Sequence, residues 1–208
     1  MFKKAVFPGK YIQGVGAIGE LPALIGSLGG RGLILASPSV HHKVLPTCGV
    51  DWGARGACIE VFRGECCEDE LSRLTAAIAQ SRADVLVGMG GGKAIDTAKI
   101  AADRAGLPVI VVPTIASTDA PTSGCAVIYS SDGVFDSVCY QRMNPAAVLV
   151  DRGSSRRRRL GSWWLGWETP CRRGSRPGPA SVPTRRTSAA GTARRPGSPS
   201  PSCATKRW

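Results

Sequence analysis

The run of residues 84–99, DVLVGMGGGKAIDTAK, limits the fold of this chain more than any other stretch. Residues 85–87 are apolar and mostly β-branched and predict a buried strand, and residues 93–105 follow with the periodicity of a helix. A second apolar run at 107–113 predicts another strand, after which a polar loop continues to Tyr129. This order forms a βαβ unit, and open α/β sheets bind ligands in the loops at the carboxyl ends of their strands.

The glycines of this unit leave no Cβ in the way of a close ligand; they are Gly88, Gly90, Gly91 and Gly92. The helix that follows them offers free N–H groups and the positive end of its dipole to a pyrophosphate, and Lys93 adds a full charge there. A Walker loop is excluded, because Val87 stands where its first glycine is required and Ala94 follows the lysine. The alternative is a glycine-rich turn without a ligand. Successive glycines lose backbone entropy on folding, so a ligand site is favoured.

Strands and helices alternate along the rest of the first 151 residues. The other predicted strands lie at residues 5–7, 11–12, 31–36, 57–62, 135–140 and 147–150. Helices are expected at 21–28 and at 68–82, and the second begins with acidic residues, as the helix dipole favours. This alternation predicts an α/β fold, a Rossmann-like parallel sheet with flanking helices on both faces.

Residues 14–19, GVGAIG, fit the dinucleotide fingerprint G-x-G-x-x-G. That fingerprint follows a strong buried strand and has an acidic residue about 20 positions later. The run before Gly14 is weak as a strand, and the later window at 36–42 holds no acid, so these glycines are interpreted as a turn that leads into a helix. The only histidines, His41 and His42, are adjacent on a predicted helix and are interpreted as surface or capping residues.

The formal charge of +12 would suit a nucleic-acid-binding protein, but it is unevenly distributed. Residues 1–151 carry 13 Lys and Arg against 14 Asp and Glu, whereas residues 152–208 carry 14 basic residues and only Glu168. The eight cysteines show no disulfide-scaffold or zinc spacing and are expected to be reduced and mostly buried. No signal peptide and no apolar run of membrane length is found, so a cytoplasmic location without a membrane partner is expected.

Three segments resemble the glycerol dehydrogenases, a branch of the iron-containing, group III alcohol dehydrogenase family. They are PGKYIQ at 8–13, GMGGGKAIDTAK at 88–99 and PTIASTDAPTS at 113–123. The resemblance covers residues 1–151, which we interpret as a dinucleotide-binding domain. It implies oxidation of a small-molecule substrate, glycerol or a related diol, with NAD as the acceptor, and a homo-oligomer in intact family members.

The resemblance also implies roles for individual residues. Gly90, Gly91, Gly92 and Lys93 would hold the pyrophosphate, and Asp119, the candidate catalytic residue, would contact glycerol. Ser37 directly follows the strand predicted at 31–36, and the residue at the end of a first Rossmann-type strand often meets the adenosine ribose. Family members usually carry Asp at this position, so NADP is not excluded. For Asp119 the alternative is a turn or cap residue. The nicotinamide side would be lined by Thr114, Ser117, Ser123, Cys125 and Tyr129.

In this family a second, helical domain supplies a divalent metal, zinc or iron, through one Asp and two His. No histidine follows His42, so these ligands are absent and no metal-binding residue is assigned. Residues 152–208 are rich in Arg, Gly, Ser and Pro, lack aliphatic periodicity, and are predicted to be mostly disordered.

The codons offer an explanation for this tail. Each residue of 153–180 can be encoded by a small set of codons. When these possible codons are read in the frame that starts at the third base of the preceding codon, they can encode family-like segments, including the one with the metal-ligand aspartate. We interpret the tail as the product of a frameshift directly after Asp151, which predicts an inactive chain. The alternative is a non-catalytic dinucleotide-binding fragment whose basic tail binds nucleic acid without sequence specificity, through phosphates and stacked bases.

Overall fold

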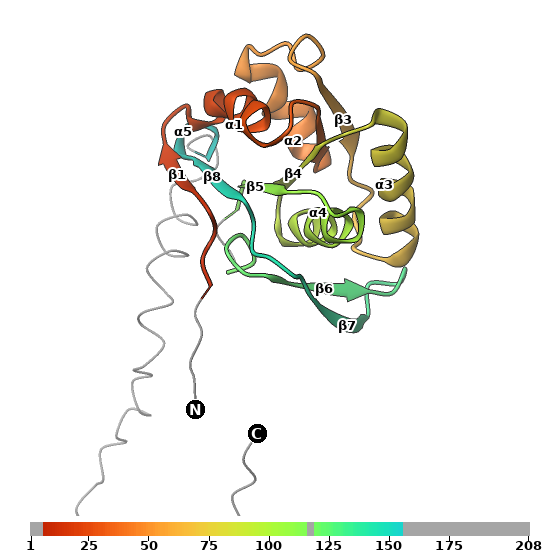
Figure 1. The fold of residues 1–208 in the computed structure, drawn as a ribbon. Helices are drawn as coiled ribbons and strands as arrows, with labels where there is room; N and C mark the ends of the chain where they lie inside the picture. The colour runs from red at the N-terminus through yellow and green to blue at the C-terminus, as the bar shows by residue number, and fades with distance from the viewer. Residues whose placement is uncertain (1–5, 116–118, 156–208) are drawn as a thin grey trace, which may run out of the picture. The chain divides into compact units, whose positions relative to one another are not determined.

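The protein is described by a computed structural model, which covers residues 6–115 and 119–155 (Figure 1). Six strands form one sheet in the order β1-β8-β5-β4-β2-β3, with every neighbouring pair parallel. The strands are β1 (Tyr11–Gly14), β2 (Gly32–Ala36), β3 (Ala57–Val61), β4 (Val85–Gly90), β5 (Val109–Pro113) and β8 (Ala147–Asp151). The predicted α/β fold with a Rossmann-like parallel sheet is therefore confirmed.

Helices cover both faces of the sheet (Figure 1). One face carries α1 (Leu21–Leu28) and α2 (Pro38–Lys43), with the short turns η1 (Ala17–Glu20) and η2 (Leu45–Cys48). The other face carries α3 (Glu68–Ser81) and α4 (Gly92–Ala105). A single turn, α5 (Arg152–Ser155), follows β8.

The central strands are buried on both faces, since every residue of β2, β4, β5 and β8 is buried. Along β2, Leu33 and Leu35 pack with α3 and α4, whereas Ile34 and Ala36 pack with α1 and α2. A parallel sheet covered on both sides needs apolar side chains at every position. This requirement explains why these strands are continuous apolar runs in the sequence.

A second, two-stranded sheet packs against α4. Its strands β6 (Cys125–Tyr129) and β7 (Phe135–Tyr140) are antiparallel, and α4 lies between this ribbon and the six-stranded sheet (Figure 1). The position of α4 buries Asp96, Thr97 and Lys99, which a helix with only one covered face would expose. From the sequence we expect β7 but place the residues of β6 in a polar loop. β6 was missed because it is only half-buried and is recognised as a strand by its pairing with β7.

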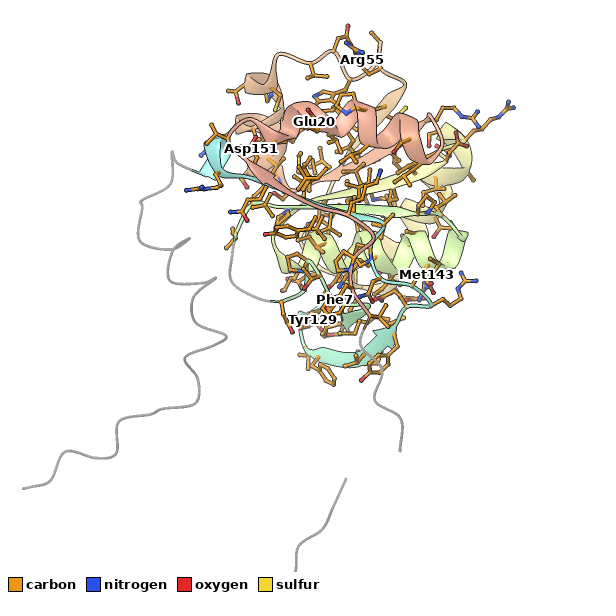
Figure 2. The ribbon with its side chains drawn as sticks, turned by 60° about the vertical axis from the view of Figure 1, so that its left-hand side comes forward. Phe7, Glu20, Arg55, Tyr129, Met143 and Asp151 are labelled. Carbon is orange, nitrogen blue, oxygen red and sulfur yellow. The ribbon has the colours of Figure 1, made fainter. Side chains whose placement is uncertain are left out.

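Residues 14–19 contain a turn at Val15 and Gly16 that leads into η1 and α1, as expected. Gly16 has a φ of 76°, and the Asp151 carboxylate accepts hydrogen bonds from the N–H groups of Gly16 and Ile18, at 3.2 and 3.1 Å. In Figure 2 Asp151 lies beside the start of this helical segment, at the end of β8. A carboxylate of the protein itself thus accepts hydrogen bonds from the N–H groups of this turn.

Several predicted boundaries differ from those observed. β4 continues to Gly90, so two glycines belong to the strand, and α3 ends at Ser81. Arg82 follows with a φ of 50°, the only positive value at a non-glycine residue in the described part of the chain. Val6 and Phe7 are not in a strand.

The predicted tail lies, beyond α5, outside the described residues. Within the described ranges, no helix has the length and apolar character needed to cross a membrane.

Candidate functional site

The carboxyl ends of β2, β4 and β5 meet at Gly90. A Cβ on Gly90 would lie 3.0 Å from the Cβ of Ser37 and 3.1 Å from the Cβ of Ala94, so only glycine lets these elements approach so closely. The Thr114 N–H donates to the Gly90 carbonyl at 2.9 Å, and the Ser37 N–H donates to the Met89 carbonyl at 2.9 Å. Three residues predicted from different parts of the sequence, Ser37, Gly90 and Thr114, are thus brought together.

The next two glycines form the start of α4. Gly91 is extended, with φ −87° and ψ −177°, and Gly92 is the first residue of the helix. The first N–H groups of an α-helix have no partner within the helix, and together with the dipole they suit an anion. No described side chain caps this helix end. The turn therefore fits the pyrophosphate of a dinucleotide.

Lys93 and Tyr129 lie together beside this turn. The Lys93 ammonium is 5.0 Å from the centre of the Tyr129 ring, and the Tyr129 N–H donates to the Cys66 carbonyl at 2.8 Å. The ammonium is also 2.6 Å from both carboxylate oxygens of Glu65. A pyrophosphate at the glycine turn would compete with Glu65 for Lys93. Sequence reasoning missed Glu65, because the loop that carries it has no motif or periodicity.

Ser123 lies in a loop that ends at Cys125, the first residue of β6, and Lys99 attaches this segment to α4. The Lys99 Nζ is 3.3 Å from the Ser123 carbonyl and 2.5 Å from the Cys125 carbonyl. Its side chain is 1% exposed and forms an ion pair with Asp96 at 3.1 Å. Burial raises the pKa of the Asp96 carboxyl, although the Lys99 charge opposes this shift. Sequence reasoning assigned no role to Lys99 beyond its place in the glycine motif.

Asp119 is exposed, and its carbonyl accepts hydrogen bonds from the N–H and hydroxyl of Thr122, at 3.1 and 3.2 Å. Asp119 therefore begins a turn, and a turn residue was the alternative to a catalytic role in the sequence analysis. Ser117 lies outside the described residues. The described candidates thus form two groups. The group around the glycine turn comprises Ser37, Gly90, Gly91, Gly92, Lys93, Thr114 and Tyr129. The group on the adjoining segment comprises Asp119, Ser123 and Cys125.

The residues that the structure describes do not form a metal site. No group of three or more His, Cys, Asp or Glu side chains within residues 6–115 and 119–155 is arranged to hold a metal ion. His41 and His42 lie on α2 and line a cleft of about 600 Å³ with Trp52 and Asp51. None of the residues that line this cleft belongs to the glycine turn or to α4.

Comparison with known proteins is consistent with this geometry. Residues 8–152 match the family described as iron-containing alcohol dehydrogenase. The glycerol dehydrogenase of Thermotoga maritima is 39% identical over 155 residues, which are 73% of this chain and 42% of that protein. The glycolaldehyde reductase of Halobacterium salinarum is 38% identical over 151 residues, 69% of this chain and 40% of that protein.

Solved structures give the same result. A probable glycerol dehydrogenase from Sinorhizobium meliloti has a TM-score of 0.65 and 39% identity, and the match covers 73% of this chain and 41% of that one. Sulfoacetaldehyde reductase from Bifidobacterium kashiwanohense, solved in complex with NAD+, shares the fold with a TM-score of 0.62 at 20% identity, covering 74% and 47%. This chain therefore spans about two fifths of the length of the curated relatives that it matches.

Proposed function

The chain belongs to the iron-containing alcohol dehydrogenase family, and on this premise we propose that residues 1–151 are the dinucleotide-binding half of a glycerol dehydrogenase. The proposal depends above all on one observation: the Cβ-free turn at the start of α4 packs against Ser37 and adjoins Lys93. The substrate of the complete enzyme would be glycerol or a related diol, as the names of the relatives suggest.

In this proposal the N–H groups after Gly91 and the Lys93 ammonium bind the pyrophosphate of NAD. Ser37 lies at the adenosine ribose. Its uncharged hydroxyl would repel a 2′-phosphate less than a carboxylate would, so the site is compatible with NADP as well as NAD. When bound, NAD supplies the acceptor for a hydride. The nicotinamide side is assigned to Thr114, Ser117, Ser123, Cys125 and Tyr129, and the contact with glycerol to Asp119.

Oxidation of glycerol in this family also needs a divalent metal, zinc or iron, which acts as a Lewis acid on the substrate hydroxyl. The described residues offer no site for it, so no step of this chain's chemistry is assigned to the metal. We propose that a frameshift after Asp151 removed the metal ligands and that the chain of 208 residues does not oxidise glycerol. Homo-oligomerisation is proposed only for intact relatives.

Titration with NADH, followed by fluorescence, tests dinucleotide binding directly. We expect the chain to bind NADH, and Lys93→Met to weaken binding about tenfold at low salt, because one charge-assisted contact with the pyrophosphate is lost. Absence of NADH binding by the folded chain would refute the proposal.

Lys10→Met is the matched control, since Lys10 is exposed and lies outside the site. Glu65→Gln gives the opposite test: it removes the carboxylate that holds Lys93, so NADH binding is expected to tighten. With NAD, glycerol and zinc, the chain of 208 residues is expected to form no NADH. Turnover under these conditions would contradict the proposed loss of the metal site.

A second candidate function rests on the charge of the tail. Residues 152–208 carry a net charge of +13 and four Trp residues. Arg and Trp together bind phosphates and stack on bases. The chain would then be a non-catalytic dinucleotide-binding fragment that also binds nucleic acid without sequence specificity.

A further inference from the structure

Lys99 is the most deeply buried charged side chain among the described residues, with 1% exposed. It lies in the middle of α4, where the helix is covered by the six-stranded sheet and the β6–β7 ribbon. Its ammonium donates to three main-chain carbonyls of one loop, those of Ala120 at 2.9 Å, Ser123 at 3.3 Å and Cys125 at 2.5 Å. An ammonium has three N–H groups, and each of them has an acceptor in this loop.

The segment at 119–125 is a loop that ends at Cys125, the first residue of β6. It carries Asp119, Ser123 and Cys125, and three of its carbonyls point toward α4, where Lys99 is their donor. The Ser123 hydroxyl also reaches the Ala120 and Cys125 carbonyls, but only at 3.4 and 3.5 Å. Without Lys99, the Ser123 carbonyl would lose its hydrogen bond and the other two carbonyls would keep only these longer ones, which is unfavourable in a half-buried place. The conformation of the loop therefore depends on Lys99.

Asp96 extends this attachment to β6. One carboxylate oxygen of Asp96 is 3.1 Å from the Lys99 ammonium, and the other accepts the Val127 N–H at 3.2 Å. Asp96 and Lys99 are three residues apart on α4 and thus lie on the same side of the helix. The pair fixes both the loop and the first half of the strand that ends at Tyr129.

The same helix begins at the glycine turn. Lys99 comes seven residues after Gly92, which places it about 10 Å along the helix axis. One rigid helix thus carries the proposed pyrophosphate site at its first turn and holds the loop two turns later. A buried ammonium is expensive to desolvate, and an apolar side chain would fill its volume, so fold stability alone does not explain a lysine here.

We infer that Lys99 is a positioning residue, which holds the loop at 119–125 in place as a preformed wall for the nicotinamide half of the dinucleotide. The inference rests on the proposed function, since it assumes that a dinucleotide binds at the glycine turn. Lys99 itself does not contact the ligand in this proposal. Its effect passes through the loop that carries Ser123 and Cys125.

Comparison of two ligands isolates this effect. ADP reaches only the glycine turn and the adenosine side, whereas NADH also reaches the loop. We expect Lys99→Met to leave ADP affinity within about twofold and to reduce the preference for NADH over ADP about tenfold, as the loss of one or two loop contacts implies. Lys10→Met is the control and is expected to change neither affinity.

Equal weakening of both ligands, or no change in either, would overturn the inference, since a merely structural lysine acts on both alike. If Lys99→Met does not fold, Asp96→Asn combined with Lys99→Met removes both buried charges and is titrated in its place. If the unmutated chain binds neither ligand, the proposed function fails. The inference is then decided by amide hydrogen exchange at residues 119–129: faster exchange confined to this segment in the variant supports it, and unchanged exchange overturns it.

Discussion

Among the single residues, Cys66 shows how burial controls reactivity. Its side chain is fully buried beneath α3 and α4, and desolvation raises the pKa of its thiol to about 11. Cys58, on β3, is exposed. The cysteines were expected to be reduced, and the six described ones are free, although only Cys66 among them is fully buried.

We predict that Cys66 in the folded chain is almost unreactive toward iodoacetamide at pH 8, because only about one thiol in a thousand would be ionised. A raised pKa favours the protonated thiol, so its reactivity should rise as the pH approaches 11. Peptide mapping by mass spectrometry measures the modification of each cysteine.

Cys58 is the internal control, and unfolding in urea should make the two cysteines react alike. Modification of Cys66 at pH 8 as fast as that of Cys58 would contradict its burial.

The residues of the site differ in how far the sequence could predict them. The glycine turn was predictable, because strand, glycines and helix are consecutive and each has a local signature. Ser37 was assigned from its place at the end of the strand predicted at 31–36, whereas Thr114 was assigned only through the family resemblance. Glu65 and Lys99 were missed, since their partners lie 28 residues away and 21 to 26 residues away in the chain, and no local pattern marks such contacts.

At the scale of elements, β4 and α4 pack closely at Gly88. A Cβ on Gly88 would lie 2.7 Å from the Cβ of Ala98 and 3.5 Å from the Cα of Ile95. The absence of a side chain at Gly88 therefore lets α4 pack directly on β4. Gly88 thus serves helix–strand packing, whereas Gly90 and Gly91 line the turn itself.

We predict that Gly88→Ala destabilises the fold by about 1–3 kcal/mol, because the added methyl group overpacks a tight contact. Urea unfolding followed by circular dichroism measures this change. NADH binding should weaken as well, since α4 is displaced at its first turn.

Gly26→Ala is the matched control, because Gly26 lies within α1 with nothing within 4 Å of an added Cβ. It is expected to be neutral or to stabilise the chain by up to about 1 kcal/mol. Equal stability of Gly88→Ala and the unmutated chain would show that the helix can shift without loss.

Helices and strands were predictable where the buried positions recur at regular intervals along the sequence. The central strands and α3 were found from their own sequences, because a continuous apolar run and an amphipathic stripe each define one element. Strand β6 was not, since Cys125–Tyr129 is recognised by its pairing with β7 and its packing on α4. The burial of Asp96, Thr97 and Lys99 on α4 was not predicted either, because the strand that covers them, β6, is remote from them in sequence.

On the scale of the whole chain, charge divides the sequence at the end of the sheet. The first 151 residues carry a net charge of −1, and the remaining 57 carry +13. The two proposed functions therefore belong to different parts of the chain and can be separated by shortening it.

We predict that a chain ending at Ser155 keeps its NADH affinity within about twofold and loses binding to random single-stranded DNA. The complete chain should bind DNA with an affinity that falls steeply with salt, because neutralised phosphates release counterions. Fluorescence anisotropy at several salt concentrations measures both. Replacement of Arg156, Arg157, Arg158 and Arg159 by Gln in the complete chain is the control and should reduce the salt dependence. DNA binding by the shortened chain would contradict the division.

The order of the strands has a consequence for synthesis on the ribosome. β1 is made first, yet its only neighbour in the sheet is β8, and the carboxylate of Asp151 completes the turn after β1. A nascent chain shorter than 151 residues can assemble β2, β4 and β5 while β1 stays unpaired beside them. The earliest strand to leave the ribosome is thus the last to dock, and the edge of the sheet closes only when residue 151 has emerged.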